Sequence, residues 1–92
     1  MSDSEFLFAL ELSDEASFDR MLNDVAKAVF LHLGVARADI DTLAAELRAA
    51  LANAARAGHR RCELRFRVQN ADLEVVVTSD GGAEWRTTRR LP

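Results

Sequence analysis

The stretch from Asp39 to Gly58 is the part of this sequence that most narrows the folds it can adopt. Its large apolar residues recur with the period of an α-helix, at Ile40, Leu43, Leu47 and Leu51. Nine of the twenty residues from 38 to 57 are alanine, which has the highest helix propensity and lets a neighbouring element approach closely. Because a glycine after the last periodic residue favours a left-handed cap, we predict a helix that ends at Gly58. Asn53 is the polar residue on the shoulder of its apolar stripe.

Length and composition predict one small domain over residues 1–92. A net charge of −3 argues against bulk nucleic-acid binding. The acidic start does not resemble a secretory signal, and no apolar run reaches the roughly 18 residues of a membrane span. The single Cys62 can form no internal disulfide, which fits a cytoplasmic protein.

The first third of the chain predicts a strand followed by a helix. In an extended strand over residues 5–12, Phe6, Phe8, Leu10 and Leu12 share one side, and Glu5 and Glu11 lie on the other. Ser13 is a suitable N-cap for a helix that runs to about Leu33 and stops at Gly34. The apolar stripe of this helix is Phe18, Met21, Leu22, Val25 and Val29. Phe30 and Leu31 lie off it, where either the second helix or a partner would cover them.

The part of the chain after Gly58 predicts a β-hairpin. Residues 61–68 and 73–78 each alternate in polarity, and Asn70, Ala71 and Asp72 supply turn chemistry between them. The tail from Glu84 to Pro92 holds one large apolar residue, Trp85, and is either a weak edge strand or frayed.

The order of elements is therefore β-α-α-β-β, with one further strand if the tail pairs. Since each strand is apolar on one face only, we predict an α/β two-layer sandwich. Its sheet would be mostly antiparallel or mixed, with two helices on one face and water on the other. The predicted core is Phe6, Phe8, Phe18, Leu22, Val25, Leu43, Leu47, Leu64, Phe66, Val75 and Val77.

Few residues suggest chemistry. Cys62 falls on the inward side of its strand and is best interpreted as a core residue. His32 and His59 have no further ligand at metal-binding spacing. The charge is uneven, because residues 1–47 hold ten acids and three bases, while residues 48–92 hold five acids and nine bases. A basic edge is either a solvated rim or a docking surface for a partner; its members would be Arg56, His59, Arg60, Arg61, Arg86, Arg89 and Arg90.

Two segments suggest a family. One is L-A-N-A-A-R-A-G, which contains Asn53, and the other is L-E-V-V-V-T-S-D-G-G-A, from Leu73 to Ala83. Together with the order of elements they resemble the GHKL (Bergerat-fold) ATPase domain, and within it the bacterial anti-sigma factor serine kinases. In that family a helix with E-x-x-x-N-A is followed by a hairpin that ends in V-x-D-x-G-x-G. The resemblance covers residues 6–83 and lies in the layout more than in the motifs.

The resemblance makes Asn53 the counterpart of the family's magnesium ligand. The family's catalytic glutamate falls on Ala49, which has no group to accept a proton. Glu46 is a poor substitute, because it lies seven residues from Asn53, or about 10 Å along the helix axis.

The second motif is matched only in part. The aspartate that binds adenine falls on Ser79, or on Asp80 if the register shifts by one residue. Gly81 matches the first glycine, and the second falls on Ala83. The sequence ends before the family's lid and second glycine-rich phosphate motif. The vestigial cofactor-binding residues are therefore Asn53, Asp80 and Gly81, and the resemblance implies no metal site unless Asn53 contributes to one.

The resemblance implies a non-catalytic regulatory protein-binding module similar to an anti-sigma factor, without a cofactor. Its partner would be a sigma factor or an anti-sigma antagonist, and neither nucleic acid nor a membrane is expected. The alternative is an ATP- and Mg²⁺-dependent anti-sigma-type serine protein kinase that still uses Asn53 and Asp80. A third alternative is a domain whose only partner is itself. A homodimer is expected in any case, because the first strand is a sheet edge and Phe30 and Leu31 lie off the helical stripe.

Overall fold

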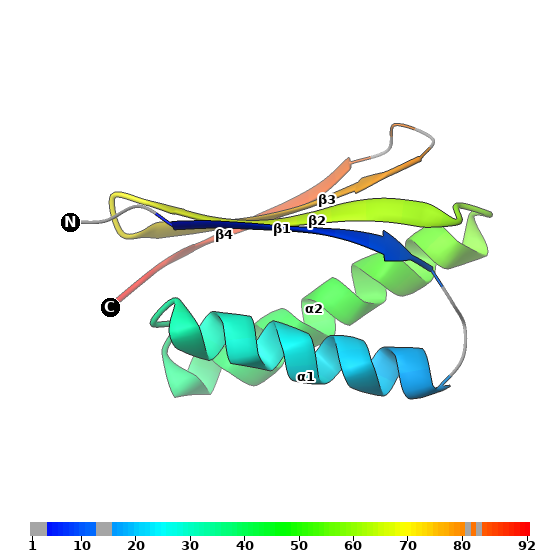
Figure 1. Ribbon diagram of the computed structural model, residues 1–92. Helices are drawn as coiled ribbons and strands as arrows, with labels where there is room; N and C mark the ends of the chain where they lie inside the picture. The colour runs from blue at the N-terminus through cyan, green and yellow to red at the C-terminus, as the bar shows by residue number, and fades with distance from the viewer. Residues whose placement is uncertain (1–3, 13–15, 81, 83) are drawn as a thin grey trace.

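The computed structural model describes residues 4–12, 16–80, 82 and 84–92. Six elements follow one another in the order β-α-α-β-β-β. The strands form one layer and the helices cover one of its faces (Figure 1), which confirms the predicted two-layer α/β sandwich. The elements are β1 (Ser4–Glu11), α1 (Ala16–His32), α2 (Arg37–Arg56), β2 (Arg61–Gln69), β3 (Asp72–Ser79) and β4 (Glu84–Arg90). The expected N-cap Ser13 lies outside the described residues.

The sheet is an antiparallel meander with the strand order β1-β2-β3-β4. β2 and β3 are joined by Asn70 and Ala71, whose φ angles of 53° and 64° are those of a type I′ hairpin turn. The tail is a strand rather than a frayed end, because β4 pairs with β3 from Glu84 to Arg90. Among the described residues, β1 and β4 are thus the two edges of the sheet.

Helix α2 supplies one side of the core as its periodicity predicts. Its large apolar residues are buried together with Ala44, where the small side chain allows close packing. Leu47 is fully buried. Gly58 has φ +92° directly after the helix, the left-handed conformation that favours glycine at this position.

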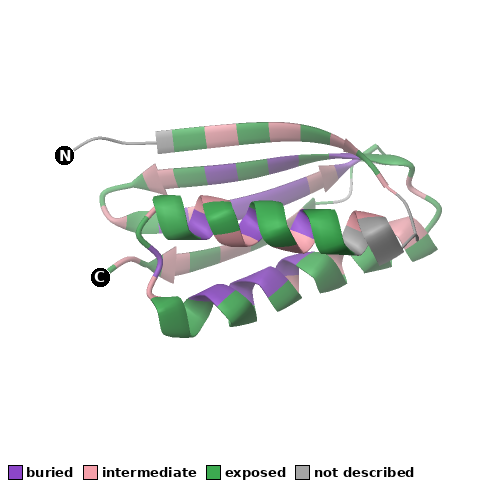
Figure 2. Ribbon diagram, turned by 60° about the horizontal axis from the view of Figure 1, so that its bottom comes forward, coloured by how far each residue is buried: buried purple, intermediate pink, exposed green. Residues whose placement is uncertain are grey.

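Helix α1 is rotated relative to the predicted stripe. Its fully or nearly fully buried residues are Leu22, Ala26 and Phe30, and the Phe30 ring stacks edge-on against Phe66 with centroids 5.3 Å apart. The prediction that Phe30 lies off the core is therefore wrong, and so is the placing of Val25 inside it. Met21 and Val25 are 49% and 36% exposed. The apolar band of this helix, which includes both Met21 and Phe30, is wider than the part of the helix that is buried (purple in Figure 2).

The opposite face of the sheet carries charged residues, as the alternation predicts. Along β2 every second residue is buried, and the arginines and glutamate between them are exposed. Val76 is an exception, being only 5% exposed although it points to the open face. It lies between Arg65 and Arg86 in the register, and the apolar stems of long cationic side chains readily cover such a residue.

Within the described part of the chain, no helix has the length and hydropathy needed to span a lipid bilayer.

Candidate functional site

The family motif on α2 leads to a shallow hollow between the end of α2 and strand β4. Asn53 is exposed there, and Ser79 at the end of β3 contributes to the same surface. The volume is about 230 Å³. We call this surface the Asn53 hollow; it is lined by Ala50, Asn53, Ala54, Ala57, His59, Val77, Ser79, Glu84 and Trp85. The structure thus brings together Asn53 and Ser79, two positions that the resemblance assigns to one site.

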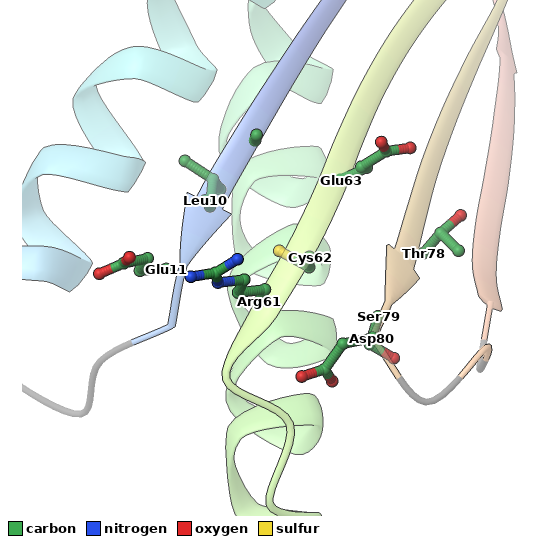
Figure 3. Close-up of a pocket in the computed structure, with 9 residues that line it drawn as sticks. Leu10, Glu11, Arg61, Cys62, Glu63, Thr78, Ser79 and Asp80 are labelled. Carbon is green, nitrogen blue, oxygen red and sulfur yellow. The ribbon is translucent and has the colours of Figure 1, made fainter.

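Asp80 lies in a different place. It lines a larger open hollow of about 630 Å³ at the ends of β1, β2 and β3, whose other charged residues are Glu11, Arg61 and Glu63 (Figure 3). Ser79 borders both hollows. The side chains of Asn53 and Asp80 therefore line separate surfaces.

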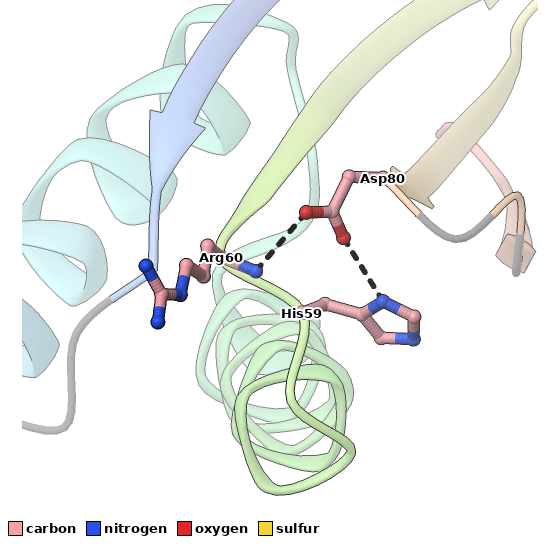
Figure 4. A network of polar contacts seen from close by, with 3 residues as sticks. All are labelled: His59, Arg60 and Asp80. Atoms are coloured by element: carbon pink, nitrogen blue, oxygen red, sulfur yellow. Dashed lines mark hydrogen bonds and ion pairs between the residues drawn. The ribbon is translucent and has the colours of Figure 1, made fainter.

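The carboxylate of Asp80 is held by the loop that follows α2. One oxygen lies 2.9 Å from His59 Nδ1, and the other accepts a hydrogen bond of 3.3 Å from the backbone N–H of Arg60 (Figure 4). The Arg60 N–H lowers the pKa of the Asp80 carboxyl below its ordinary value, and the His59 side chain adds to this effect. These contacts tie the end of β3 to the loop, which gives Asp80 a structural role.

The remaining motif positions do not add an acid–base group. Ala49 is exposed in a second hollow that adjoins Asn53. Glu46 also borders that hollow, but its carboxylate lies 3.0 Å from Arg89 Nη2 in a partly buried pair. Gly81, the third vestigial residue, lies outside the described residues.

The charged residues of the Asn53 hollow are already paired. His59 contacts Asp80, and the Glu84 carboxylate accepts a 2.8 Å hydrogen bond from Arg86. Over the described ranges, no three His, Cys, Asp or Glu side chains come together in a way that could hold a metal ion. The hollow can offer a ligand an apolar floor, an indole ring and one carboxamide.

Comparison with known protein families and curated proteins identifies no relative of this chain. No protein-family model matches the chain, and no curated protein is significantly similar to it. The resemblance to anti-sigma kinases therefore depends on the layout and the two segments described above.

The three arginines that β4 contributes to the predicted basic edge are divided between two faces, and each is paired with an acid. Arg90 pairs with Asp72 and Arg89 with Glu46, each at 3.0 Å, while Arg86 contacts both Glu74 and Glu84. Arg86 and Arg90 point to the open face of the sheet and Arg89 to the helix side, as the alternation along β4 requires. This arrangement favours the solvated rim over a cationic docking surface.

Trp85 is the site residue that the sequence analysis overlooked. It was noted only as the large apolar residue of the tail, whereas it is half-buried and borders both hollows beside Asn53. Apart from Trp85 itself, residues 84–90 show no alternation of polarity, so it is the pairing of Trp85 with the buried Val77 of β3 that places it on the helix side.

Proposed function

We propose that this protein is a non-catalytic regulatory module that binds a protein partner through the Asn53 hollow, in the manner of an anti-sigma factor. The observation that carries this proposal is the lining of the hollow. Four small apolar or aliphatic residues, Ala50, Ala54, Ala57 and Val77, line the hollow together with the half-buried Trp85. Shallow apolar hollows with an aromatic side chain are typical anchor points for a partner's side chain.

The chemistry of the hollow fits a side chain better than a nucleotide. The kinase alternative needs an acid–base group near Asn53, whereas Ala49 has none to offer and the Glu46 carboxylate is paired with Arg89. One carboxamide is a weak ligand for Mg²⁺, which prefers carboxylates and phosphates.

The regulatory role comes from the resemblance to anti-sigma kinases. It makes a sigma factor or an anti-sigma antagonist the expected partner and the cytoplasm the expected location. The buried thiol of Cys62 fits a reducing compartment. No role in binding nucleic acid or membranes is proposed.

The proposal is tested with the sigma factors and anti-sigma antagonists encoded in the source genome, purified one by one and titrated against the labelled chain by fluorescence anisotropy. We expect one of them to bind with a Kd of about 1 μM or tighter. Trp85→Ala should weaken that binding at least ~10-fold, because it removes the aromatic anchor.

Asn53→Arg should weaken binding to a similar extent, since it fills the hollow while preserving helix propensity. Thr88→Ala is the matched control, because Thr88 lies on the open face of β4, the strand that carries Trp85. This substitution should leave the affinity unchanged. Failure of every candidate to bind would refute the proposal, and so would binding that is indifferent to both hollow variants.

A further inference from the structure

We propose that the partner presents an acidic extended segment, which pairs as an added strand with the free edge of β4 and places alternate apolar side chains beside Trp85. This mode of binding rests on the proposed role of the Asn53 hollow and specifies the chemistry of its partner. In strand addition, backbone hydrogen bonds supply affinity and pockets for alternate side chains supply specificity.

The backbone of β4 has a free edge. The Leu91 N–H donates to the carbonyl of Ala71, a pair that continues the register between β3 and β4. Since the direction of backbone groups alternates from residue to residue along a strand, the odd-numbered residues of β4 direct these groups at β3. The even-numbered residues, from Glu84 to Arg90, direct theirs away from the sheet, where an added strand would meet them.

A hollow of about 390 Å³ lies beside this edge. It is the second hollow, which Ala49 borders, and its described lining comes from α2 and β4 without a residue of β3. The hollow shares Ala50, Asn53 and Trp85 with the Asn53 hollow. The two hollows therefore form one groove between α2 and the edge strand, which a segment that pairs with β4 can reach.

Trp85 and Thr87 set the spacing along this groove. Both are half-buried on the helix side of β4, and residues two positions apart in a strand are separated by about 6.4–6.8 Å. An added strand has the same period, so two of its side chains face the groove opposite Trp85 and Thr87. The surrounding alanines and the indole suit apolar side chains of moderate size, such as valine.

The charge of β4 selects an acidic segment. β4 holds three arginines and one glutamate, a net charge of +2. Arg67 shows how the sheet accommodates an arginine on its open face, because Glu5 lies opposite it on one neighbouring strand and Glu74 on the other. Opposite charges on adjacent strands stabilise a sheet, and like charges destabilise it.

Two arginines of β4 have such a partner on their inner side only. Arg90 lies opposite Asp72 of β3, and its side chain is 73% exposed. Arg86 contacts acids of β3 and of β4 itself, and its side chain is 54% exposed. β4 is an edge of the described sheet, so the outer side of both arginines faces the position of an added strand. Glutamates placed there would complete the arrangement seen around Arg67.

The first test uses a synthetic peptide in place of the partner. An antiparallel strand with glutamates opposite Arg90 and Arg86, and valines opposite Thr87 and Trp85, has the sequence E-T-T-V-E-V-T. Titrated into the ¹⁵N-labelled chain, the capped peptide should cause saturable NMR shifts along β4 and at the Trp85 indole, with a Kd below about 1 mM. The peptide K-T-T-V-K-V-T should bind at least ~10-fold more weakly. Equal affinities, or shifts confined to other elements, would overturn the proposal.

The second test locates the backbone hydrogen bonds. In this register the odd-numbered residues of the peptide direct their N–H groups at β4. N-methylation of the third residue should therefore abolish the shifts. N-methylation of the second residue, whose N–H faces water, should leave the affinity nearly unchanged. Binding that tolerates methylation of the third residue would contradict strand addition.

The third test reverses the charge of the edge. Arg90→Glu should make the lysine peptide the tighter ligand. Arg20→Glu is the matched control, because it changes the net charge equally at an exposed position of α1; it should leave the preference for the acidic peptide unchanged. An Arg90→Glu variant that keeps this preference would refute the role of charge.

These measurements need no natural partner, so they separate strand addition from the proposed function. If the acidic peptide does not bind while a sigma factor or antagonist binds in a manner that depends on Trp85, strand addition is wrong and the proposed function stands. If the peptide binds along β4 and none of the regulators does, strand addition stands and the anti-sigma role is wrong.

Discussion

The Nδ1 atom of His59 lies 2.9 Å from an Oδ1 oxygen of Asp80 and joins the loop after α2 to the end of β3. The other Asp80 oxygen accepts from the Arg60 N–H. Three consecutive elements of the chain, the end of α2, the start of β2 and the end of β3, thus meet at one exposed carboxylate.

The Asp80 contacts predict a contribution to stability that depends on pH. The folded protein lowers the pKa of this carboxyl from its ordinary 3.8, first through the Arg60 N–H. The contribution is therefore complete above about pH 4 and is lost as pH falls through the lowered value. Melting temperatures between pH 2 and 6 should decline less steeply for Asp80→Asn than for the wild type. Asp41→Asn, which removes another exposed carboxylate, is the control. A melting temperature that falls with acidification as steeply in Asp80→Asn as in the wild type would contradict the prediction.

Cys62 predicts the opposite dependence at alkaline pH. Burial, with a smaller effect from the Asp80 charge, raises the pKa of its thiol from 9.0 to about 11. The unfolded chain therefore loses this proton first, and stability should fall as pH rises from 9 towards 11, by about 2–3 kcal/mol. Urea unfolding should show this slope in the wild type and lose it in Cys62→Ala. The sequence has no tyrosine and one lysine, so Lys27→Gln completes the control; an equal slope in Cys62→Ala would reject the assignment.

The rotation of α1 predicts contrasting effects of two substitutions. Phe30→Ala should lower the free energy of unfolding by about 3–5 kcal/mol, because Phe30 is fully buried against Phe66. Leu47→Ala on α2 should cost about 2–5 kcal/mol for the same reason. Val25→Ala should change the stability of the monomer by less than ~1 kcal/mol. Urea denaturation at low protein concentration measures all three free energies of unfolding. If Val25→Ala costs as much as Phe30→Ala, Val25 is buried as the predicted stripe requires.

The β2–β3 turn predicts a stabilising substitution. Ala71 has φ +64°, a conformation that costs an L-residue roughly 1–2 kcal/mol and glycine almost nothing. After the greater freedom of glycine in the unfolded chain is subtracted, Ala71→Gly should stabilise the protein by about 0.5–1 kcal/mol. Ala45→Gly in the exposed part of α2 should cost about 1 kcal/mol. Thermal unfolding of both variants checks the opposite signs; a destabilised Ala71→Gly would argue against the type I′ turn.

Periodicity was sufficient to predict the fold. The 3.6-residue repeat of α2 and the alternation of β2 and β3 each specify one buried face, and one layer of helices on one face of a sheet is the arrangement that covers both. The phase of α1 was not predictable in the same way, because its apolar band includes both Val25 and Phe30. Which part of that band is buried depends on where α2 and the sheet lie, and the local sequence does not contain that information.

The candidate site was predictable only in part. The motifs predicted Asn53, Asp80 and Gly81 as vestigial cofactor-binding residues; Asn53 and Asp80 border different hollows, and Gly81 lies outside the described residues. Asp80 is held by His59 and Arg60, which lie twenty or more residues away along the chain. Likewise, the partners of Arg86, Arg89 and Arg90 are set by the register between β3 and β4 and by the position of α2. Trp85 was not predictable as a site residue, because residues 84–90 do not alternate in polarity and only the pairing of β4 with β3 fixes the side on which it lies.

The most direct test of a protein-binding rather than a nucleotide-binding role for the Asn53 hollow is a titration of the ¹⁵N-labelled chain with Mg²⁺ and ATP at millimolar concentration, followed by heteronuclear NMR. We predict no shifts at Asn53, Ser79 or the Trp85 indole, and no rise in melting temperature, since stabilisation by a ligand vanishes when its Kd greatly exceeds its concentration. Saturable shifts at these three residues, lost in Asn53→Ala, would contradict the binding-module proposal and favour the kinase.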